Sequence, residues 1–181
     1  PAVPWLSFFP EVNVRTYVKA GGKAGVYFFS LEAANPLAVS IARSLYRLPY
    51  FNAAMRCQKL PSGEVHYRSD RTHRGAPTAG FSGRYRPVEA VKLTTPGSLE
   101  HWFSERYALY TTDRTGGVYR GEIHHVQWPL QRAEADIERN TMTAGHGITL
   151  PDVPPLLHYA DRIEVAVWPL EGVSQDRQAA G

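Results

Sequence analysis

An arginine, a carboxylate and an imidazole alternate along one short stretch of the chain, VYRGEIHHVQW (118–128). Successive side chains of a strand point to opposite faces, so Arg120, Glu122 and His124 share one face if this stretch is a strand. Arginine binds a carboxylate through two parallel donors, glutamate can move a proton or orient the imidazole, and histidine titrates near neutral pH. The row therefore predicts either a ligand pocket or a solvated surface ion pair.

Other candidate residues extend this row or lie on neighbouring segments. Arg15 shares a predicted strand face with Tyr17, opposite a row of valines, and the SERY segment (104–107) could reach the mouth of a pocket or form a surface pair. Ligand pockets combine apolar walls with a few polar groups, which favours a cavity here. The predicted catalytic residues are Glu122 and His124, and the predicted ligand-binding residues are Glu11, Arg15, Tyr17, Glu105, Arg120 and Trp128.

Metal, thiol and imine chemistry receive little support from the remaining residues. His124 and His125 are adjacent, so only one of them can join a given site. Cys57 has no neighbouring signature of a nucleophile, and a plain thiol is favoured. The four lysines, which lie beside turns or at strand ends, lack the desolvated setting that a Schiff base needs. We predict no metal, no cofactor and no imine-forming lysine.

The elements that would position these residues are short strands and two helices. Asn35 with Pro36, and Thr95 with Pro96, are typical of an N-cap and first helical residue, and they predict helices near 36–47 and 97–105. The segment 130–142 favours helix by propensity, but its small and apolar residues alternate with acidic ones, which predicts a strand. Alternation or apolar content predicts further strands over 12–19, 24–32, 50–56, 64–71, 81–88, 89–93, 106–112, 118–128 and 158–168.

These elements predict an α+β fold with a mainly antiparallel sheet, curled into a barrel. Strands follow one another through short turns, so a doubly wound parallel sheet is disfavoured. We expect a single domain over residues 1–173 and a disordered tail over 174–181. The chain begins at Pro1 and enters its first strand abruptly, from which we expect that the natural chain has a preceding segment.

Composition fits a soluble protein of ordinary polarity. Net charge is +3 with scattered arginines, so no nucleic-acid partner is predicted, and no apolar run is long enough to span a membrane. A single cysteine fits a reducing cytoplasm. No Walker loop, GxGxxG, GxSxG, HExxH or paired CxxC is present. We expect a cytoplasmic protein with a small-molecule ligand, and assembly into a homo-oligomer stays open.

Several motifs together resemble the YqjF-like family of uncharacterised bacterial proteins. Their order and spacing agree with the family up to about residue 169, although family members carry a further N-terminal segment. The motifs are FFPEVNVRTYV, GVYFFSLEAANPLAVSIARSLYRLPYF, FSGRYRP, PGSLEHWFSERYALY, GGVYRGEIHHVQWPLQ and PPLLHYADRIEVAVWP.

The YqjF-like family is grouped with acetoacetate decarboxylase-like proteins, and this resemblance implies a closed, cone-like antiparallel barrel with a central cavity. The lysine pair of the decarboxylase falls at Leu48 and Pro49 here, so the resemblance implies the fold without Schiff-base decarboxylation. A decarboxylase glutamate corresponds to Glu11 in the same comparison.

Three functions are consistent with the sequence. The first is binding of a small anionic or carbonyl-bearing metabolite in a barrel cavity. The second is a lyase-type or hydrolase-type enzyme that uses Glu and His as acid and base without a covalent lysine. The third is a structural or partner-binding domain whose barrel interior is filled. Whether the interior is open or packed discriminates between these functions.

Overall fold

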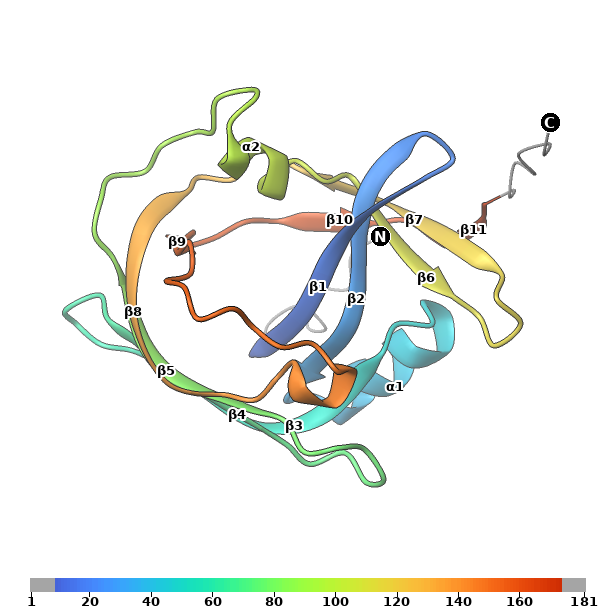
Figure 1. Ribbon diagram of the computed structural model, residues 1–181, viewed down its shortest axis with the longest axis horizontal. Helices are drawn as coiled ribbons and strands as arrows, with labels where there is room; N and C mark the ends of the chain where they lie inside the picture. Colours follow the sequence, from blue (N-terminus) through green and yellow to red (C-terminus); the bar gives the residue numbers. More distant parts are fainter. Residues whose placement is uncertain (1–8, 174–181) are drawn as a thin grey trace.

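Eleven strands and two α-helices make up the computed structural model, which describes residues 9–173 (Figure 1). The helices are α1 (Pro36–Leu45) and α2 (Leu99–Ser104), and a 3-10 turn, η2, covers Ala144–His146. The strands are β1 (Glu11–Ala20), β2 (Lys23–Ala33), β3 (Tyr50–Lys59), β4 (Val65–Arg71), β5 (Gly80–Pro87), β6 (Ala108–Thr112), β7 (Val118–His125), β8 (Gln131–Asn140), β9 (His158–Tyr159), β10 (Val165–Val167) and β11 (Glu171–Gly172).

The strands form one curled sheet in the order β10-β7-β6-β2-β3-β4-β5-β8-β9, with β1 on β2 and β11 on β7. Only β2–β3 and β2–β6 pair in parallel; the other ladders are antiparallel, as predicted. Closure into a barrel is not confirmed, because no ladder within residues 9–173 joins β9 to β10. These end strands hold two and three residues, too few to form a long ladder.

Side-chain caps decide where the helices begin. Asn35 Oδ1 accepts hydrogen bonds from two backbone N–H groups of the first turn of α1, which confirms the predicted N-cap. The second helix begins later than predicted, and its cap is Ser98 rather than Thr95. Ser98 Oγ accepts from the N–H of His101 over 3.1 Å, whereas Gly97 has a φ of +88°, which a helix cannot include.

Tertiary pairing decides the uncertain strands. The segment after Pro129 is a strand, as its alternation predicted, because β8 pairs along its length with β5 and at its start with β9. The predicted strand 89–93 makes only a single bridge, between Lys92 and Leu130. The predicted strand 158–168 is divided into β9 and β10, and the predicted tail 174–181 lies outside the described residues.

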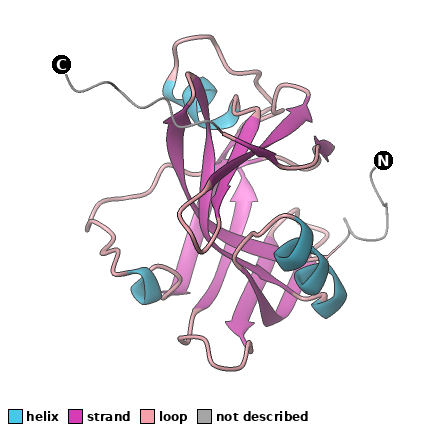
Figure 2. Cartoon of the chain, turned by 90° about the vertical axis from the view of Figure 1, so that its right-hand side faces the viewer, coloured by secondary structure: helices cyan, strands magenta, loops and turns pink. Residues whose placement is uncertain are grey.

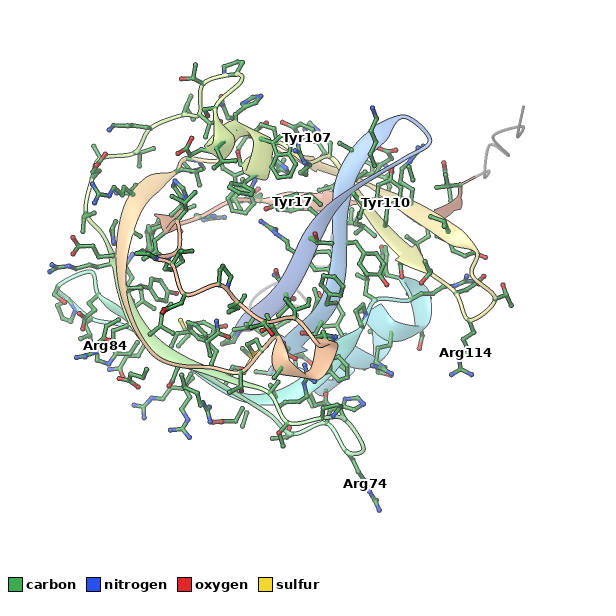
Figure 3. All side chains as sticks on the ribbon, in the orientation of Figure 1. Tyr17, Arg74, Arg84, Tyr107, Tyr110 and Arg114 are labelled. Carbon is green, nitrogen blue, oxygen red and sulfur yellow. The ribbon has the colours of Figure 1, made fainter. Side chains whose placement is uncertain are left out.

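The arc of β3, β4, β5 and β8 has two faces of different character. In Figure 3, Arg84 lies on the outer side of this arc, where charged side chains form ion pairs within and between the strands. Cys57, Tyr67 and Ile137 occupy the opposite, concave face, since their backbones pair in one continuous register through Gly83. Tyr85, two residues beyond Gly83, lies on the same face.

A hydrophobic core lies where β2, β6 and the end of α1 meet. Its buried members are Val26, Leu31, Leu48 and Leu109, against which half-buried aromatic side chains pack. Seen from the side, strands form the body of the molecule and helical segments lie at its periphery (Figure 2). Within residues 9–173, neither helix has the length and apolar character needed to cross a membrane.

Candidate functional site

A half-buried carboxyl group lies where β1, β3 and β4 approach one another beside the concave face. Tyr50 Oη donates a hydrogen bond to Glu11 Oε2 over 2.7 Å, and Tyr67 Oη donates to the backbone carbonyl of Glu11 over 2.8 Å. Asn13 Nδ2 makes a longer contact of 3.5 Å with Glu11 Oε1. Three strands therefore bring one acid and two phenols together, and we call Glu11, Tyr50 and Tyr67 the Glu11 cluster.

Burial raises the pKa of every ionisable group in this cluster. Burial raises the pKa of Glu11, an effect that the hydrogen bond from Tyr50 opposes and the negative charge of Glu32 reinforces. The pKa of Tyr50 is raised by burial and then by the charge of Glu11, and burial raises the pKa of Tyr67 as well. On the same face, burial raises the pKa of Tyr85 to about 12. The wall thus presents neutral phenols, of which Tyr85 is the one whose hydroxyl makes no hydrogen bond within residues 9–173.

The concave face beside this cluster is open rather than filled by a packed core. Cys57 is exposed there although it points toward the inside of the arc, and Ile137 is 41% exposed. Partial burial raises the pKa of the Cys57 thiol, so the sulfur stays protonated and behaves as a weak donor. A small molecule can therefore reach the phenols from this side.

A model of the DUF2071 family, described as an uncharacterized conserved protein, matches residues 1–164. The chain belongs to this family. Among its relatives is the uncharacterized protein YqjF of Bacillus subtilis (strain 168), which is 48% identical over 170 residues. That alignment covers 94% of this chain and 69% of YqjF. The family resemblance that the motifs predicted is therefore confirmed.

Solved structures show which fold the DUF2071 chain adopts. A structure of acetoacetate decarboxylase matches it with a TM-score of 0.57 and 11% identity, covering 91% of this chain and 68% of the other. The acetoacetate decarboxylase of Legionella pneumophila matches with a TM-score of 0.47 and 10% identity, covering 91% of this chain and 66% of the other. The first likeness, at so low an identity, shows an acetoacetate decarboxylase-like fold and nothing of the activity.

The predicted row on β7 forms an ion-paired group of the DUF2071 chain with a partner that sequence reasoning missed. Arg120 Nε lies 2.9 Å from Glu122 Oε1, although it is not aligned as a hydrogen bond, and Lys23 also pairs with Glu122. The side chains of Arg120 and Glu122 are 27% and 39% exposed. Lys23 first, and then Arg120, hold the pKa of Glu122 below its ordinary value. This geometry favours the surface ion-pair alternative.

The two adjacent histidines of β7 have opposite environments. His124 is exposed, and no hydrogen bond or ion pair involves it within the described part of the chain. His125 is 7% exposed, and its ring stacks on Tyr107 with centroids 4.7 Å apart. Trp128 contacts the His125 ring edge-on at 5.8 Å rather than continuing the row of His124, because β7 ends at His125 and the alternation ends with it.

The remaining predicted residues gather near α2. Tyr17 packs against Trp102 and Phe103 with ring centroids 4.7 and 5.3 Å apart, and Arg15 Cζ lies 5.9 Å from the Tyr17 ring. Glu105 accepts a hydrogen bond from the hydroxyl of Tyr107. Within residues 9–173, no hydrogen bond, ion pair or ring contact joins Arg15 to the β7 row. Among the predicted residues, Glu11 alone belongs to the Glu11 cluster.

Sequence reasoning missed Tyr50 and Tyr67 as partners of Glu11. Tyr67 shares one face of β4 with the buried residues Val65 and Ser69, and a phenol on such a face is a signal that it needs a partner. Tyr50 directly follows Pro49, in the region where the resemblance places the lysines of the decarboxylase. Neither signal indicated which residue would accept the hydrogen bond.

The lysines of the DUF2071 chain have settings that disfavour imine formation. Lys23 pairs with Glu122, Lys92 Nζ lies 2.7 Å from Glu89, and Lys59 Nζ lies 2.5 Å from Asp161. Lys19, near the end of β1, is exposed to solvent. The hydrogen bond to Asp161 raises the pKa of Lys59, whereas a Schiff-base lysine needs a lowered pKa. Within residues 9–173, no three His, Cys, Asp or Glu side chains gather as metal ligands.

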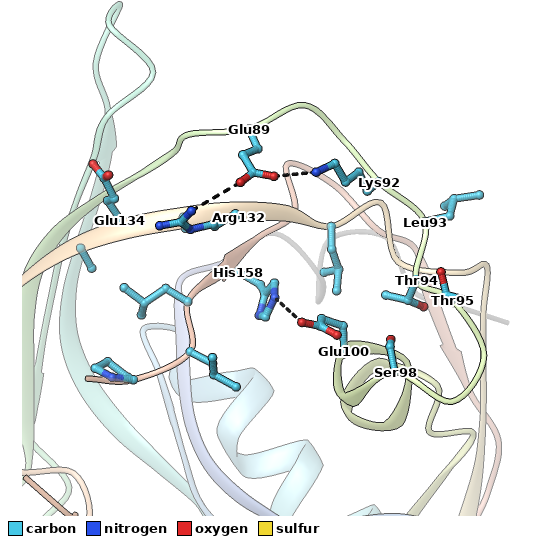
Figure 4. A pocket seen from close by; sticks show the side chains of 16 residues that line it. Glu89, Lys92, Leu93, Thr94, Thr95, Ser98, Glu100, Arg132, Glu134 and His158 are labelled. Carbon is cyan, nitrogen blue, oxygen red and sulfur yellow. Dashed lines mark hydrogen bonds and ion pairs between the residues drawn. The ribbon is translucent and has the colours of Figure 1, made fainter. Parts of the chain in front are cut away.

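A separate groove of about 680 Å³ lies between α2, the start of β8 and the segments 89–95 and 155–158 (Figure 4). Glu89 contacts Lys92 at 2.7 Å and Arg132 at 3.5 Å along one rim. On the other side, His158 Nε2 lies 3.8 Å from Glu100 Oε1, which is longer than a hydrogen bond. This Glu–His pair lines the groove, whereas a closer pair, Glu64 with His66 at 2.7 Å, lies on the exposed surface.

The first testable prediction concerns the charge of Glu11. Because burial raises the pKa of Glu11 in the folded state, its protonated form is favoured by folding. That contribution to stability is present below the unfolded pKa of about 4.3 and is lost as the pH rises through the folded pKa. Glu11→Gln imitates the protonated group, so we expect it to be more stable than the wild type at pH 7, with a smaller difference near pH 4.5.

Urea denaturation at both pH values measures this difference. Glu164→Gln, at an exposed carboxylate paired with Arg162, is the matched control. Its free energy of unfolding should differ little from that of the wild type at either pH. If Glu11→Gln is less stable than the wild type at pH 7, the buried carboxylate is favoured by its hydrogen bonds more than it is opposed by burial, and the prediction is wrong.

Proposed function

We propose that this DUF2071 protein is a cytoplasmic binding protein for a small carbonyl-bearing metabolite, which docks on the concave face beside the Glu11 cluster. The observation that carries the proposal is a carboxyl group whose pKa is raised by burial, hydrogen-bonded by Tyr50 over 2.7 Å, next to an open wall of neutral phenols. Neutral donors suit a carbonyl oxygen, which accepts hydrogen bonds without bringing a charge.

The charges around Glu11 favour a carbonyl group over an anionic group at this position. The groups that act on its pKa are Tyr50, Asn13 and the negatively charged Glu32, and no cation is among them. An anion placed here would lose its hydration without gaining a positive partner, which is unfavourable in a partly buried site. If the ligand also carries a carboxylate, that group should therefore point away from Glu11.

A keto acid is the ligand class that we infer from the fold. The structural relative is named for acetoacetate, a keto acid, and the present chain shares only its fold. Since Lys59 has a raised pKa, Lys23 and Lys92 are paired, and Lys19 is exposed to solvent, the carbonyl carbon would not be attacked by a lysine amine. We therefore propose reversible binding rather than decarboxylation through an imine.

The two alternative functions lose support on this geometry. An acid–base enzyme would find its Glu–His pair at Glu100 and His158 rather than at Glu122 and His124, since His124 is exposed. A structural domain with a filled interior would bury the concave face, whereas Cys57 is exposed and Ile137 is 41% exposed.

Binding of acetoacetate, followed by protein NMR, tests the proposal, and 3-hydroxybutyrate is the matched probe. The two molecules share the carboxylate and differ in the carbonyl. We expect saturable shifts with acetoacetate, binding at least about fivefold weaker for 3-hydroxybutyrate, and a similar loss in Tyr85→Phe, because this variant lacks the phenol whose proton is not already donated to Glu11. Glu164→Gln should bind as the wild type does.

Equal affinity for the two probes, or no saturable shift with acetoacetate, would overturn the proposal. Borohydride treatment of the acetoacetate complex provides a chemical check. We expect the mass of the protein to be unchanged, because reversible binding leaves no imine to reduce. A lysine adduct detected by mass spectrometry would instead show covalent chemistry and contradict the assignment of a binding protein.

A further inference from the structure

A second cavity, of about 480 Å³, lies where the end of α1 approaches β2, β3, β6 and η2. Its lining includes Arg43, Arg47 and His146, together with the aromatic rings of Tyr27, Phe29 and Phe51. No aspartate or glutamate is among the lining residues. This composition differs from the Glu11 cluster, where the ionisable groups are an acid and phenols.

We propose that this basic pocket binds a planar organic carboxylate, with the carboxylate held by Arg43 and Arg47 and the ring held between aromatic side chains. Arginine presents its donors in a planar fork that matches a carboxylate, and its donors stay charged at any physiological pH. The proposal concerns a different cavity and a different ligand chemistry from the carbonyl site, and neither depends on the other.

Arg47 is held in place by its backbone, while its side chain stacks on Tyr119 and makes only a long ion pair. It is the non-glycine residue with a positive φ, +52°, within residues 9–173, and its carbonyl accepts a hydrogen bond from Thr111 Oγ1 over 2.8 Å. This residue follows Tyr46, the C-cap of α1, where a left-handed conformation commonly ends a helix. The guanidinium carbon lies 4.1 Å from the ring centroid of Tyr119, and the side chain is 44% exposed.

Asp113, the acidic neighbour of Arg47, has other hydrogen-bond donors. Asp113 lies 3.4 Å from Arg47 Nη1, the longest of its polar contacts. The Asp113 carboxylate already accepts hydrogen bonds of 2.7 to 2.9 Å from Thr115, Gly117 and Tyr119. These donors hold the pKa of Asp113 well below its ordinary value. Arg47 can therefore turn toward a ligand without leaving a carboxylate unpaired.

Arg43, in the last turn of α1, is fixed in place and keeps donors free for a ligand. Its Nη1 donates to the backbone carbonyl of Tyr50 over 2.6 Å, and its guanidinium carbon lies 5.8 Å from the ring centroid of Phe51. A guanidinium has five N–H donors, of which this contact uses one. The two arginines therefore approach the cavity from α1 and from the segment that follows it.

His146 supplies a polar atom that lacks a partner in the described residues. Its Nε2 is buried and makes no hydrogen bond, and its ring lies 5.8 Å from the ring of Phe29. A buried nitrogen without a partner is unfavourable by itself, and a ligand oxygen in the cavity would satisfy it. Phe29 in turn meets Tyr27 edge to face at 5.7 Å, which completes an aromatic wall for a flat ligand.

Calorimetric titration with benzoate, and with acetate as its matched probe, tests the proposal on the intact chain. We expect saturable binding of benzoate with a Kd of about 1 mM or tighter. Acetate should bind at least about tenfold more weakly, because it lacks the ring that the aromatic wall would cover. Arg43→Gln and Arg47→Gln should each weaken benzoate binding by about tenfold or more, since each removes a charge-assisted hydrogen bond.

Arg114→Gln is the matched control, because Arg114 is exposed on the turn after β6 and points away from the sheet in Figure 3. It should bind benzoate as the wild type does, and circular dichroism should show that each variant remains folded. Benzoate binding that Arg43→Gln and Arg47→Gln leave unchanged would overturn the proposal, as would no saturable binding by the wild type. Equal affinities for acetate and benzoate would overturn the proposal that the ligand has a planar ring.

Discussion

Replacing Arg71 with methionine is expected to lower the free energy of unfolding by about 3–5 kcal/mol, because it leaves a buried carboxylate without its partner. Glu32 is fully buried, and the side chain of Arg71 is 2% exposed. Arg71 Nε donates to Glu32 Oε1 over 2.9 Å, and Nη2 donates to the same oxygen. Phe51 covers the guanidinium, whose carbon lies 4.0 Å from the ring centroid.

Equilibrium unfolding in urea measures this loss, and Arg68→Met is the matched control. Arg68 lies on the same strand but on the outer face, where its side chain is 66% exposed and pairs with Asp70, so its removal should have little effect. The double variant Glu32→Met with Arg71→Met should recover much of the loss, since no charge is then left buried. A loss in Arg71→Met no larger than that in Arg68→Met would contradict the prediction.

The second large effect is expected at Gly25, where β2 passes close to β6. A Cβ atom at this position would lie 2.4 Å from the carbonyl oxygen of Ala108 and 2.8 Å from Cε2 of Tyr110. The nearest of these atoms belongs to the backbone and cannot move aside without parting β2 from β6, which pair through Val26 and Leu109. We expect Gly25→Ala to lower the free energy of unfolding by about 3 kcal/mol or more.

Thermal and urea unfolding both report this effect, and Gly172→Ala is the control. A Cβ atom at Gly172 would meet nothing within 4 Å, so this variant should unfold as the wild type does. If Gly25→Ala is no less stable than Gly172→Ala, then β2 and β6 can move apart with little loss in the free energy of unfolding. The parallel ladder between β2 and β6 would then contribute little to stability.

The two proposed sites meet at one residue. The hydroxyl of Tyr50 donates to Glu11 over 2.7 Å, and the carbonyl of Tyr50 accepts from Arg43 over 2.6 Å. Tyr50 begins β3, directly after the segment that joins this strand to α1. The phenol therefore belongs to the neutral wall, while the backbone of the same residue fixes an arginine of the basic pocket.

The sequence by itself determined those features that depend on neighbouring residues. Asn35 and Pro36 start α1 because a cap needs only the first turn of its own helix. The alternation after Pro129 outweighed helical propensity, because one side of β8 faces the inside of the arc and the other bears ion pairs. The family resemblance also followed from local motifs, since their order and spacing are written along the chain.

The tertiary structure decided which of two correctly predicted faces is buried and which side chains meet. Alternation placed His124 and His125 on opposite faces but could not tell that His125 would be the buried one. The partners of Glu32 and Glu11 are each 39 residues away, at Arg71 and Tyr50. Contacts of this kind depend on how the sheet curls and on the bulge that shifts the register between β1 and β2. The curl of the sheet and the bulge both arise from the packing of the whole chain. The alternating pattern of a strand determines which side chains share a face, but it does not determine which strands lie beside that strand.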